Sequence, residues 1–478
     1  MAGRAPLRGQ PLRRPLRGAR RAHRQPGGLE RQRRAHPRPE PRRLTAMDFD
    51  HLFTNARLPG RDGLVDLAVR DGRFAAVEPG LPPNGPSEDL GGRLVIPGFV
   101  ETHLHLDKAC LLGRCDCGAG SVGEAIAAVT AAKRGFTEAD VYERARRVLE
   151  RAVAQGTTRI RTHVEVDPRI GLTSFRALRR LKADYAWAVD LELCAFPQEG
   201  LLDDPGCEDV LVAALEEGAD LVGGVPYIDR DADGHVARIF ALARRFDVDI
   251  DFHLDFDLDP TWLRLDEVCR WADRTGWGGR VAIGHATKLS ALPPEAFGRA
   301  ARRLAGAGVA VTVLPATDLF LMGREAACNV PRGVAAAHRL ARAGVTCSIA
   351  TNNVLNPFTP YGDASLLRMA NLYANVAQVS SEPDLALCLD LVTDQAARLM
   401  RCADYGLAPG RRADLVVLDA RSPAEAVCTL AWPLQGMKNG RRSFARPMPL
   451  LSPPGEAARA PGPLLGPPLG PALGPALG

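Results

Sequence analysis

The feature that most limits how this chain can fold is a repeated pair of segments, a short apolar run rich in Val and Ile followed by an amphipathic stretch. Apolar runs separated by helix-like segments are typical of buried parallel strands joined by helices. Eight such runs predict an α/β fold in which a parallel sheet closes into a (β/α)8 barrel. The predicted barrel strands are residues 94–106, 158–166, 185–196, 220–228, 248–256, 280–287, 309–317 and 345–353.

Two segments that flank the predicted barrel do not follow this alternation. Residues 47–93 and 405–446 contain short strand-like runs separated by Gly and Asp turns. Because they bracket the barrel in sequence, we expect them to pair in space as one small β-domain made from both flanks. The barrel is then residues 94–404.

The two ends of the chain differ in composition from the part between them. Residues 1–46 hold 14 of the 61 basic residues, all arginine, and only 2 of the 56 acidic residues, so the rest of the chain is acidic. Segments with few large apolar side chains cannot bury enough surface to fold, and we expect 1–46 and the Pro/Gly-rich 447–478 to be disordered. The first segment is either sequence upstream of a natural start at Met47, or another tail without function, or an arm that contacts nucleic-acid phosphates. We favour the readings without function and expect no nucleic-acid partner.

Composition excludes several other classes of protein. With 46% apolar and 24% charged residues, the chain is neither wholly disordered nor fibrous. No stretch approaches the ~18–20 consecutive apolar residues of a membrane-spanning helix. Eleven cysteines without a C-x-x-C pattern indicate reduced thiols, and hence a cytoplasmic protein, rather than a disulfide framework or a zinc ribbon. The sequence leaves open whether the chain forms a homo-oligomer.

Histidines gather at the ends of the predicted barrel strands, the edge where such barrels place their chemistry. His103 and His105 are two residues apart, so on a strand they point the same way and can chelate one ion. His253 from another strand completes a set typical of a catalytic zinc or iron site with an open position for water. A single strand-end histidine is usually a core residue, but the addition of His163 and His285 at two further strand ends is hard to explain by packing. The pattern predicts a metal site.

Several motifs resemble those of a known family, the cytosine deaminase branch of the amidohydrolase superfamily. The order and spacing of that branch are matched by VIPGFVETHLHLDKA, TRIRTHVEVDP, AFPQEG, FHLDFD, GHATKL and NNVLNPFTPYGD, and LAPGRRADLVVLD resembles the closing β-domain motif of the superfamily. The resemblance covers about residues 48–445. It implies one catalytic divalent ion, zinc or iron or else manganese, bound by His103, His105, His253 and Asn352.

The resemblance also assigns roles to residues around the ion. It implies that His285 polarises the attacking water or the substrate, and that Gln198 reads the amide edge of a planar heterocycle. We expect the neighbouring amide Asn353 to contact the substrate as well. No lysine ends the fourth predicted strand (GGVPY), which argues against a second metal bridged by a carbamylated lysine.

Two positions depart from the family pattern. The metal-binding and proton-accepting aspartate aligns with Asn352 or Asn353, and the proton-shuttling glutamate aligns with Phe256. An amide oxygen can bind a metal, but an amide cannot take a proton from water near neutral pH. The candidates to replace the missing acceptors are Asp255, Asp257, Asp318 and Asp363, while Glu165 and Asp167 either belong to the site or cap a helix.

Strand alternation ranks these candidates. Asp255 shares the side-chain direction of His253, whereas Phe256 points to the opposite face. Asp318 lies near the end of the seventh predicted strand. We therefore expect Asp255 and Asp318 to act with His285 in catalysis, and Phe256 to be either a wall against the substrate ring or a core residue.

The sequence thus predicts a single-metal hydrolase acting on a C–N bond of a small nitrogen heterocycle, most simply an aminohydrolase similar to cytosine deaminases that releases ammonia from a cyclic amidine. Two alternatives in the same class are the opening of a cyclic amide or amidine and the loss of an alkylamine from a ring. A third alternative is a degenerate member that binds a heterocycle or a metal without turnover.

Overall fold

The computed structural model of the protein describes residues 49–115, 120–447 and 449. The terminal segments predicted to be disordered, 1–46 and nearly all of 447–478, lie outside these residues. No helix within the described residues is long and apolar enough to cross a membrane.

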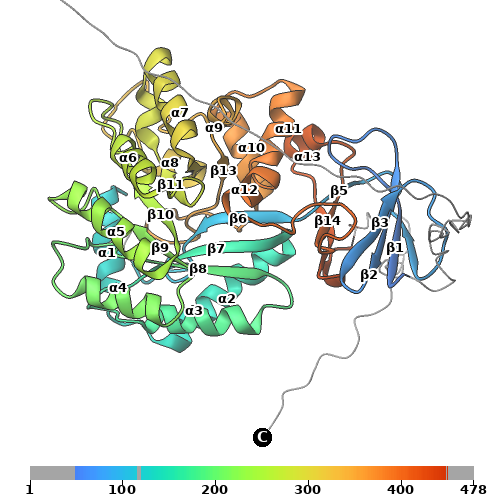
Figure 1. Ribbon diagram of the computed structural model, residues 1–478, viewed down its shortest axis with the longest axis horizontal. Helices are drawn as coiled ribbons and strands as arrows, with labels where there is room; N and C mark the ends of the chain where they lie inside the picture. Colours follow the sequence, from blue (N-terminus) through green and yellow to red (C-terminus); the bar gives the residue numbers. More distant parts are fainter. Residues whose placement is uncertain (1–48, 116–119, 448, 450–478) are drawn as a thin grey trace, which may run out of the picture. The chain divides into compact units, whose positions relative to one another are not determined.

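Eight strands form one sheet whose order follows the chain and whose neighbouring strands are all parallel. Helices cover the outside of this sheet (Figure 1), so the strands are buried on both faces. The predicted (β/α)8 barrel is therefore confirmed. Its strands are β6 (Phe99–Leu104), β7 (Thr157–Glu165), β8 (Asp190–Phe196), β9 (Leu221–Gly224), β10 (Asp249–Leu254), β11 (Val281–His285), β12 (Val309–Val313) and β13 (Cys347–Ile349).

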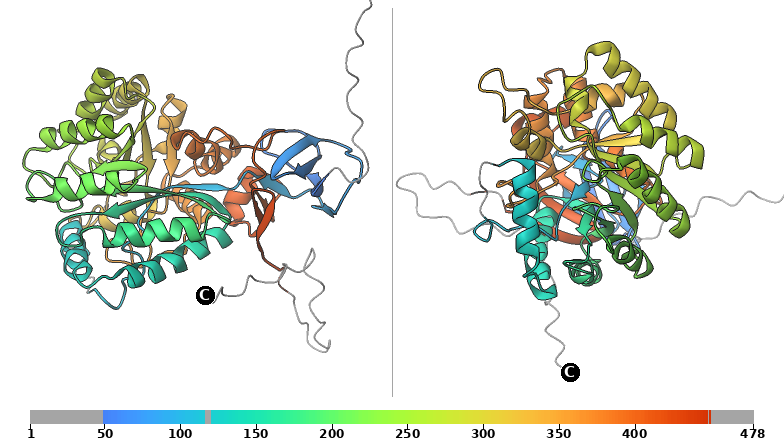
Figure 2. Two further views of the ribbon diagram at one scale, coloured as in Figure 1. Left: turned by 60° about the horizontal axis from the view of Figure 1, so that its bottom comes forward. Right: turned by 90° about the vertical axis from the view of Figure 1, so that its left-hand side faces the viewer.

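The helices surround the strands when the barrel is viewed from different sides (Figure 2). Helix α2 (Glu138–Ala154) shows why these sequences fold as they do: the Thr137 side chain accepts a hydrogen bond from the Asp140 N–H, and residues such as Val141 and Val148 bury one face. The other helices are α1 (Val122–Lys133), α3 (Thr173–Asp184), α4 (Cys207–Glu216), α5 (Ala232–Phe246), α6 (Leu265–Thr275), α7 (Pro294–Ala307), α8 (Pro315–Leu321), α9 (Ala337–Arg342), α10 (Leu366–Val376), α11 (Glu382–Asp390), α12 (Asp394–Leu399) and α13 (Pro423–Thr429).

The barrel closes along a seam between β6 and the segment that includes and follows β13. The hydroxyls of Thr102 and Ser348 lie 2.8 Å apart across this seam. The Asn352 N–H donates to the His103 carbonyl at 2.8 Å, and the Asn352 carbonyl accepts from the His105 N–H at 2.8 Å. The closing seam therefore places Asn352 directly beside the two histidines of β6.

Two four-stranded sheets make up the small β-domain, in the orders β3-β2-β1-β4 and β16-β15-β14-β5. They share one hydrophobic core, to which Phe53 and Leu67 come from the first sheet and Val95, Leu415 and Met437 from the second. As predicted, both flanking segments build this domain. The first segment forms one sheet, and the second segment forms most of the other. The strands are β1 (His51–Ala56), β2 (Val65–Arg70), β3 (Arg73–Glu78), β4 (Ser87–Asp89), β5 (Leu94–Ile96), β14 (Leu415–Leu418), β15 (Pro433–Lys438) and β16 (Arg441–Ala445).

The first predicted barrel strand, 94–106, divides into two strands that belong to different sheets. Strand β5 pairs with β14 in the small β-domain, and only β6 belongs to the barrel. The chain turns between them at Gly98, where φ is +89° and an added Cβ atom would lie 2.5 Å from Thr158 Cγ2. A side chain does not fit there, so the turn requires glycine. The barrel thus begins at Phe99 rather than at residue 94.

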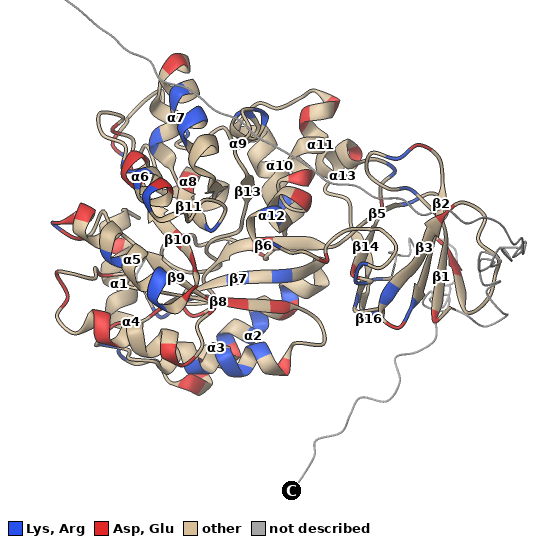
Figure 3. Ribbon diagram, in the orientation of Figure 1, with Lys and Arg blue, Asp and Glu red and all other residues tan. Residues whose placement is uncertain are grey.

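Ion pairs tie the small β-domain to the amino ends of β7 and β8. Arg159 Nη2 lies 3.8 Å from Asp414 Oδ2, and the Nζ of the buried Lys438 lies 2.8 Å from carboxylate oxygens of both Asp190 and Asp414. Figure 3 shows basic residues within β7 and acidic residues within β8, strands that are otherwise largely uncharged. The contact between the two parts of the chain is therefore polar as well as apolar.

Candidate active site

Three histidine side chains converge at the carboxyl ends of β6 and β10. The Nε2 atom of His253 lies 3.2 Å from His103 Nε2 and 3.1 Å from His105 Nε2. A zinc ion with bonds of about 2.0–2.1 Å and tetrahedral geometry keeps its ligand nitrogens about 3.3 Å apart. His253 Nε2 therefore lies at the spacing of two ligands of one ion from each of the other two nitrogens.

The chemical state of these histidines also fits a metal. Burial lowers the pKa of His103, His105 and His253 well below the ordinary value, so all three imidazoles are neutral and offer a lone pair. The Nδ1 atoms of all three have no hydrogen-bond partner among the described residues. One His253 Nε2 atom cannot satisfy two facing imidazole nitrogens, whereas a cation satisfies all three.

The closing seam fixes the backbone of Asn352 beside His103 and His105. Its Oδ1 atom is buried and has no hydrogen-bond donor among the described residues. Unsatisfied buried oxygens are costly, and a cation is one way to satisfy them. Ligation by Asn352 stays a prediction from the family resemblance.

A fourth histidine that was not assigned to the metal set joins the cluster. His163, on β7, stacks on His103 with ring centroids 3.8 Å apart, and neither of its nitrogens has a hydrogen-bond partner within the described part of the chain. Ligand atoms of His103, His163 and His253 lie within 4.8 Å of one another. The position of His163 at the end of a predicted strand was the feature of the sequence that pointed to this cluster. His163 and His105 are thus alternative third histidines beside a shared pair.

The buried carboxylate of Asp251 lies behind the cluster. Its Oδ1 atom is 3.9 Å from His103 Nδ1 and 3.6 Å from His163 Nε2, while Arg161 Nη1 holds Oδ2 at 3.0 Å. A carboxylate behind a ligating imidazole orients the ring and raises its basicity. Asp251 was not foreseen, although it precedes His253 by two residues and so shares its strand face.

His285 and Asp318 form a buried pair next to the cluster. His285 Nδ1 lies 2.6 Å from Asp318 Oδ1, and Asp318 Oδ2 accepts a hydrogen bond from the Leu314 N–H. With the proton on Nδ1, the Nε2 atom of His285 keeps a lone pair for another partner. Asp318 comes from the first turns of α8 rather than from the end of the preceding strand β12.

Backbone strain is concentrated around these residues. Asp255, His285 and Asn352 all have positive φ values, of 51°, 70° and 63°. Left-handed backbone costs non-glycine residues on the order of 1–2 kcal/mol each. Such outliers cluster where surrounding structure holds side chains in place for function, and here each one ends or follows a barrel strand.

The structure gives the carboxylate of Asp255, predicted to act in catalysis, a different set of partners. The left-handed backbone at Asp255 breaks the strand alternation, and its two carboxylate oxygens accept hydrogen bonds from the N–H groups of Arg264 and Leu265 at the start of α6. Asp255 therefore caps a helix. Two other candidates are also engaged away from the cluster, Asp257 with Lys288 and Asp363 with Arg368.

The same break in alternation turns Phe256 toward the site, opposite to the predicted direction. Its ring centroid lies 3.7 Å from that of His285, with 31° between the planes. Phe256 is buried, and Tyr227 lies beside it with ring centroids 6.3 Å apart. An aromatic face thus borders the His285–Asp318 pair. This is the position expected if Phe256 packs against the ring of the substrate.

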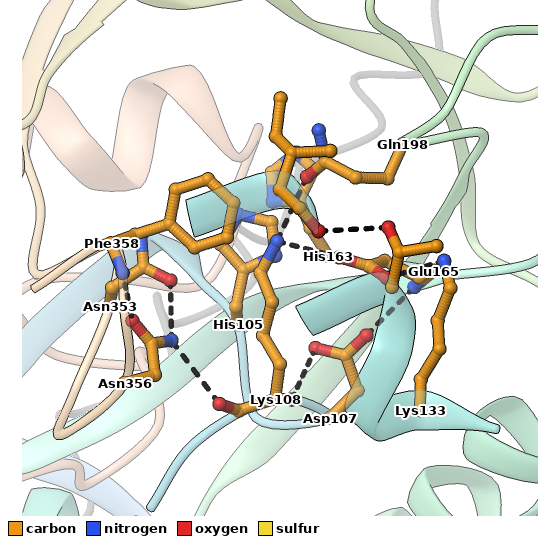
Figure 4. Close-up of polar contacts among 12 residues, drawn as sticks. His105, Asp107, Lys108, Lys133, His163, Glu165, Gln198, Asn353, Asn356 and Phe358 are labelled. Carbon is orange, nitrogen blue, oxygen red and sulfur yellow. Dashed lines mark hydrogen bonds and ion pairs between the residues drawn. The ribbon is translucent and has the colours of Figure 1, made fainter. Parts of the chain in front are cut away.

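Gln198 lies in a buried polar network on the other side of the cluster (Figure 4). Lys108 Nζ donates to Gln198 Oε1 at 2.9 Å and to Glu165 Oε1 at 2.7 Å, and it lies 4.5 Å from the centre of the Phe358 ring. Lys108 therefore connects Glu165 to Gln198, the residue expected to contact the substrate. The sequence motif HLDK includes Lys108 but does not predict a role for it.

Lys133, in α1, connects that network to a second set of carboxylates. Its Nζ atom lies 3.0 Å from Glu165 Oε2 and 2.6 Å from Asp167 Oδ2, and it also bonds Glu199. Burial acts to lower the pKa of Lys133, but the three carboxylates raise it, so the side chain is an ammonium ion. Asp167 thus binds Lys133 in addition to the turn that follows it.

We expect Lys133→Met to destabilise the protein by about 3–5 kcal/mol, because the substitution leaves buried carboxylates without their cation. Urea unfolding followed by circular dichroism measures this loss. Lys182→Met is the matched control, since Lys182 pairs with Asp220 at a half-exposed position and its loss should cost no more than about 1 kcal/mol. Equal losses in the two variants contradict the prediction.

Comparison with known proteins agrees with this geometry. The model of the amidohydrolase family matches residues 88–183 and 137–431. The chain is 29% identical over 416 residues to N-isopropylammelide isopropyl amidohydrolase of Pseudomonas sp. (strain ADP), covering 82% of this chain and 97% of that protein. It is 29% identical over 376 residues to pterin deaminase of Rhizobium rhizogenes, covering 77% of this chain and 85% of that protein.

A solved structure is similar over nearly the same range. The structure of 5-methylcytosine deaminase from Klebsiella pneumoniae, liganded with 5-fluorocytosine, superposes with a TM-score of 0.81 at 30% identity. The match covers 85% of this chain and 100% of that one. Both the barrel and the small β-domain therefore have counterparts among solved proteins.

Proposed function

The chain belongs to the amidohydrolase superfamily, and on that premise we propose that it hydrolyses an exocyclic C–N bond of a small nitrogen heterocycle, most simply as an aminohydrolase that releases ammonia. The observation that carries this proposal is the convergence of His103, His105 and His253 next to the His285–Asp318 pair. Two of the similar proteins are deaminases of pterin and of 5-methylcytosine, which supports the same class of substrate.

We propose that His103, His105 and His253 hold a divalent ion, with Asn352 Oδ1 as a further ligand. Members of the superfamily use such an ion, and when bound it supplies Lewis-acid activation of water. One cation would satisfy the Nε2 atoms that face one another in this set, and the buried Asn352 Oδ1 has no donor among the described residues. Whether the ion is zinc, iron or manganese is decided by elemental analysis of the purified protein.

The residues of the chain then divide the remaining work. His285 Nε2 accepts a proton from the attacking water and returns it to the leaving nitrogen, while Asp318 keeps the other imidazole proton on Nδ1. Phe256 supplies an apolar face for a planar ring, and Gln198 and Asn353 supply polar contacts to its edge. This arrangement moves the proton-transfer role from carboxylates to a histidine, which matches the amide at position 352 and the phenylalanine at position 256.

The proposal is tested by elemental analysis followed by an ammonia-release assay on aminopyrimidines, pterins and aminotriazines, with N-alkylated rings included. Ammonia or amine release from at least one ring by the metal-loaded protein supports it. Release of an alkylamine alone favours hydrolysis of an N-alkyl group. The similarity to N-isopropylammelide isopropyl amidohydrolase supports this alternative. Stoichiometric metal without turnover of any ring favours a degenerate member that binds without catalysis. The observation behind this alternative is that Asn352 and Phe256 replace the carboxylates of the family pattern.

We expect Asn352→Asp to tighten metal binding by about tenfold, which corresponds to about 1.4 kcal/mol. An anionic oxygen replaces a neutral one at a position where the present oxygen has no donor. Competition with a fluorescent chelator measures the affinity. Asn371→Asp is a control, since Asn371 lies on α10 and donates to the Val427 carbonyl. Unchanged or weaker affinity in Asn352→Asp argues against ligation by residue 352.

A further inference from the structure

We propose that this site selects a ring that presents hydrogen-bond acceptors along its recognised edge, such as an oxo-substituted azine in neutral or anionic form, over a ring that presents amino donors there. The inference rests on the proposed function, because it concerns the substrate of the same site. It follows from the direction in which the two substrate-facing amides are fixed by their neighbours.

The amide of Gln198 is fixed by Lys108. A lysine ammonium can only donate, so the amide atom 2.9 Å from Lys108 Nζ must be the oxygen. The Gln198 NH₂ group then lies on the opposite side of the amide, and no described residue accepts a hydrogen bond from it. Gln198 therefore offers its NH₂ donors to a ligand, while its oxygen is engaged by Lys108.

The amide of Asn353 is fixed by a chain of two hydrogen bonds. Asn356 Oδ1 accepts from the N–H groups of Phe358 and Thr359, at 3.0 and 3.2 Å, so the other end of that side chain must be the NH₂ group. This group lies 2.8 Å from Asn353, and the facing atom of Asn353 must be its oxygen. The Asn353 NH₂ group is left without an acceptor in the described part of the chain. Asn353, like Gln198, offers donors.

The carboxylates beside these amides are already used by the protein (Figure 4). Glu165 accepts from Lys108 and Lys133, at 2.7 and 3.0 Å, and Asp107 accepts from the N–H groups of Lys108 and Glu165, at 2.8 Å each. Each carboxylate already accepts two hydrogen bonds from the protein, which leaves fewer of its lone pairs for an amino group of a ligand. The ammonium of Lys108 itself adds a positive charge on this side, which favours carbonyl oxygens and anionic rings.

Two ring compounds with the same substitution pattern provide the test. Barbiturate carries oxygens, and 2,4,6-triaminopyrimidine carries amino groups, at the same three ring positions. Titration calorimetry with the metal-loaded full chain should give barbiturate at least about a tenfold lower Kd, because unpaired donors in the site penalise the amino compound. Equal affinities, tighter binding of the triamine, or binding of neither compound overturns the proposal.

Gln198→Glu makes the test specific. The substitution keeps the shape and the bond from Lys108, but the second atom becomes an acceptor, so the preference for barbiturate should fall by at least about tenfold. Asn353→Asp makes the same change through an independent contact and covers the case in which Gln198→Glu does not fold. Gln378→Glu, at an exposed position that makes none of these contacts, should leave the preference unchanged. An unaltered preference in folded Gln198→Glu and Asn353→Asp contradicts the proposal.

The outcome is separable from that of the proposed function. Binding selectivity that follows the expected pattern, without ammonia release from any ring, refutes the aminohydrolase and leaves the acceptor preference standing. Turnover of a ring whose recognised edge carries only amino donors refutes the acceptor preference and leaves the aminohydrolase standing.

Discussion

His253→Ala is expected to lose the bound divalent ion and to lower turnover by about 10⁴-fold, which equals about 5.5 kcal/mol of transition-state stabilisation. His253 Nε2 lies within 3.2 Å of both His103 Nε2 and His105 Nε2. It is therefore the central member of the proposed ligand set. Without it, two neutral imidazoles and one amide oxygen remain. Metal content is measured by mass spectrometry of the dialysed protein, and turnover by ammonia release.

His51→Ala is the control for this variant, since His51 lies on β1 in the small β-domain, 3.7 Å from Glu88. It should keep one ion per chain and full turnover. Because His253 is buried, circular dichroism must show that the barrel of His253→Ala is folded. A folded His253→Ala with stoichiometric metal would remove this residue from the ligand set.

Asp318→Asn has the second largest expected effect, a decrease in kcat of roughly 10²–10⁴-fold with the metal retained. The two oxygens of Asp318 accept from His285 Nδ1 and from the Leu314 N–H. An asparagine presents one NH₂ group to one of these two donors. Either the imidazole is forced to carry its proton on Nε2, which removes the proton acceptor, or the start of α8 is disturbed.

The pH profile distinguishes these outcomes from a general loss of structure. If Asp318 acts through His285, the variant should lose the dependence of kcat on a neutral imidazole while its unfolding midpoint changes little. Asp363→Asn, which alters an aspartate paired with Arg368 at 2.9 Å, should match the wild type in both measurements. Full activity of Asp318→Asn at every pH would leave the proton acceptor unidentified and exclude this pair.

Much of the fold was predictable from the sequence, because parallel strands buried on both faces must be apolar along their length. All eight predicted barrel runs contain a strand, in the predicted order. The error at 94–106 arose because an apolar run does not show where a chain leaves one sheet and enters another. The chain changes sheet at Gly98. The need for glycine there is evident only in the structure, from its positive φ and from the closeness of Thr158.

The site was predictable where it depends on strand position, and not where it depends on the next helix. The H-x-H pair and His253 follow from strand periodicity alone. The orientations of Asp255 and Phe256 do not, since the first N–H groups of α6 draw Asp255 out of alternation. Likewise, the buried partners of Lys108 come from other strands and loops, so no local pattern identifies them.

The closing seam has a kinetic consequence. It joins Thr102 to Ser348, residues 246 positions apart in the chain, and the same seam sets Asn352 against His103 and His105. Contacts of such high contact order form late, since the entropy of a very large loop must be lost first. The complete set of proposed ligands is then expected only in chains that have finished folding. If these residues hold a divalent ion as proposed, the ion should bind the native state in preference to partly folded ones and draw the population toward closure by mass action.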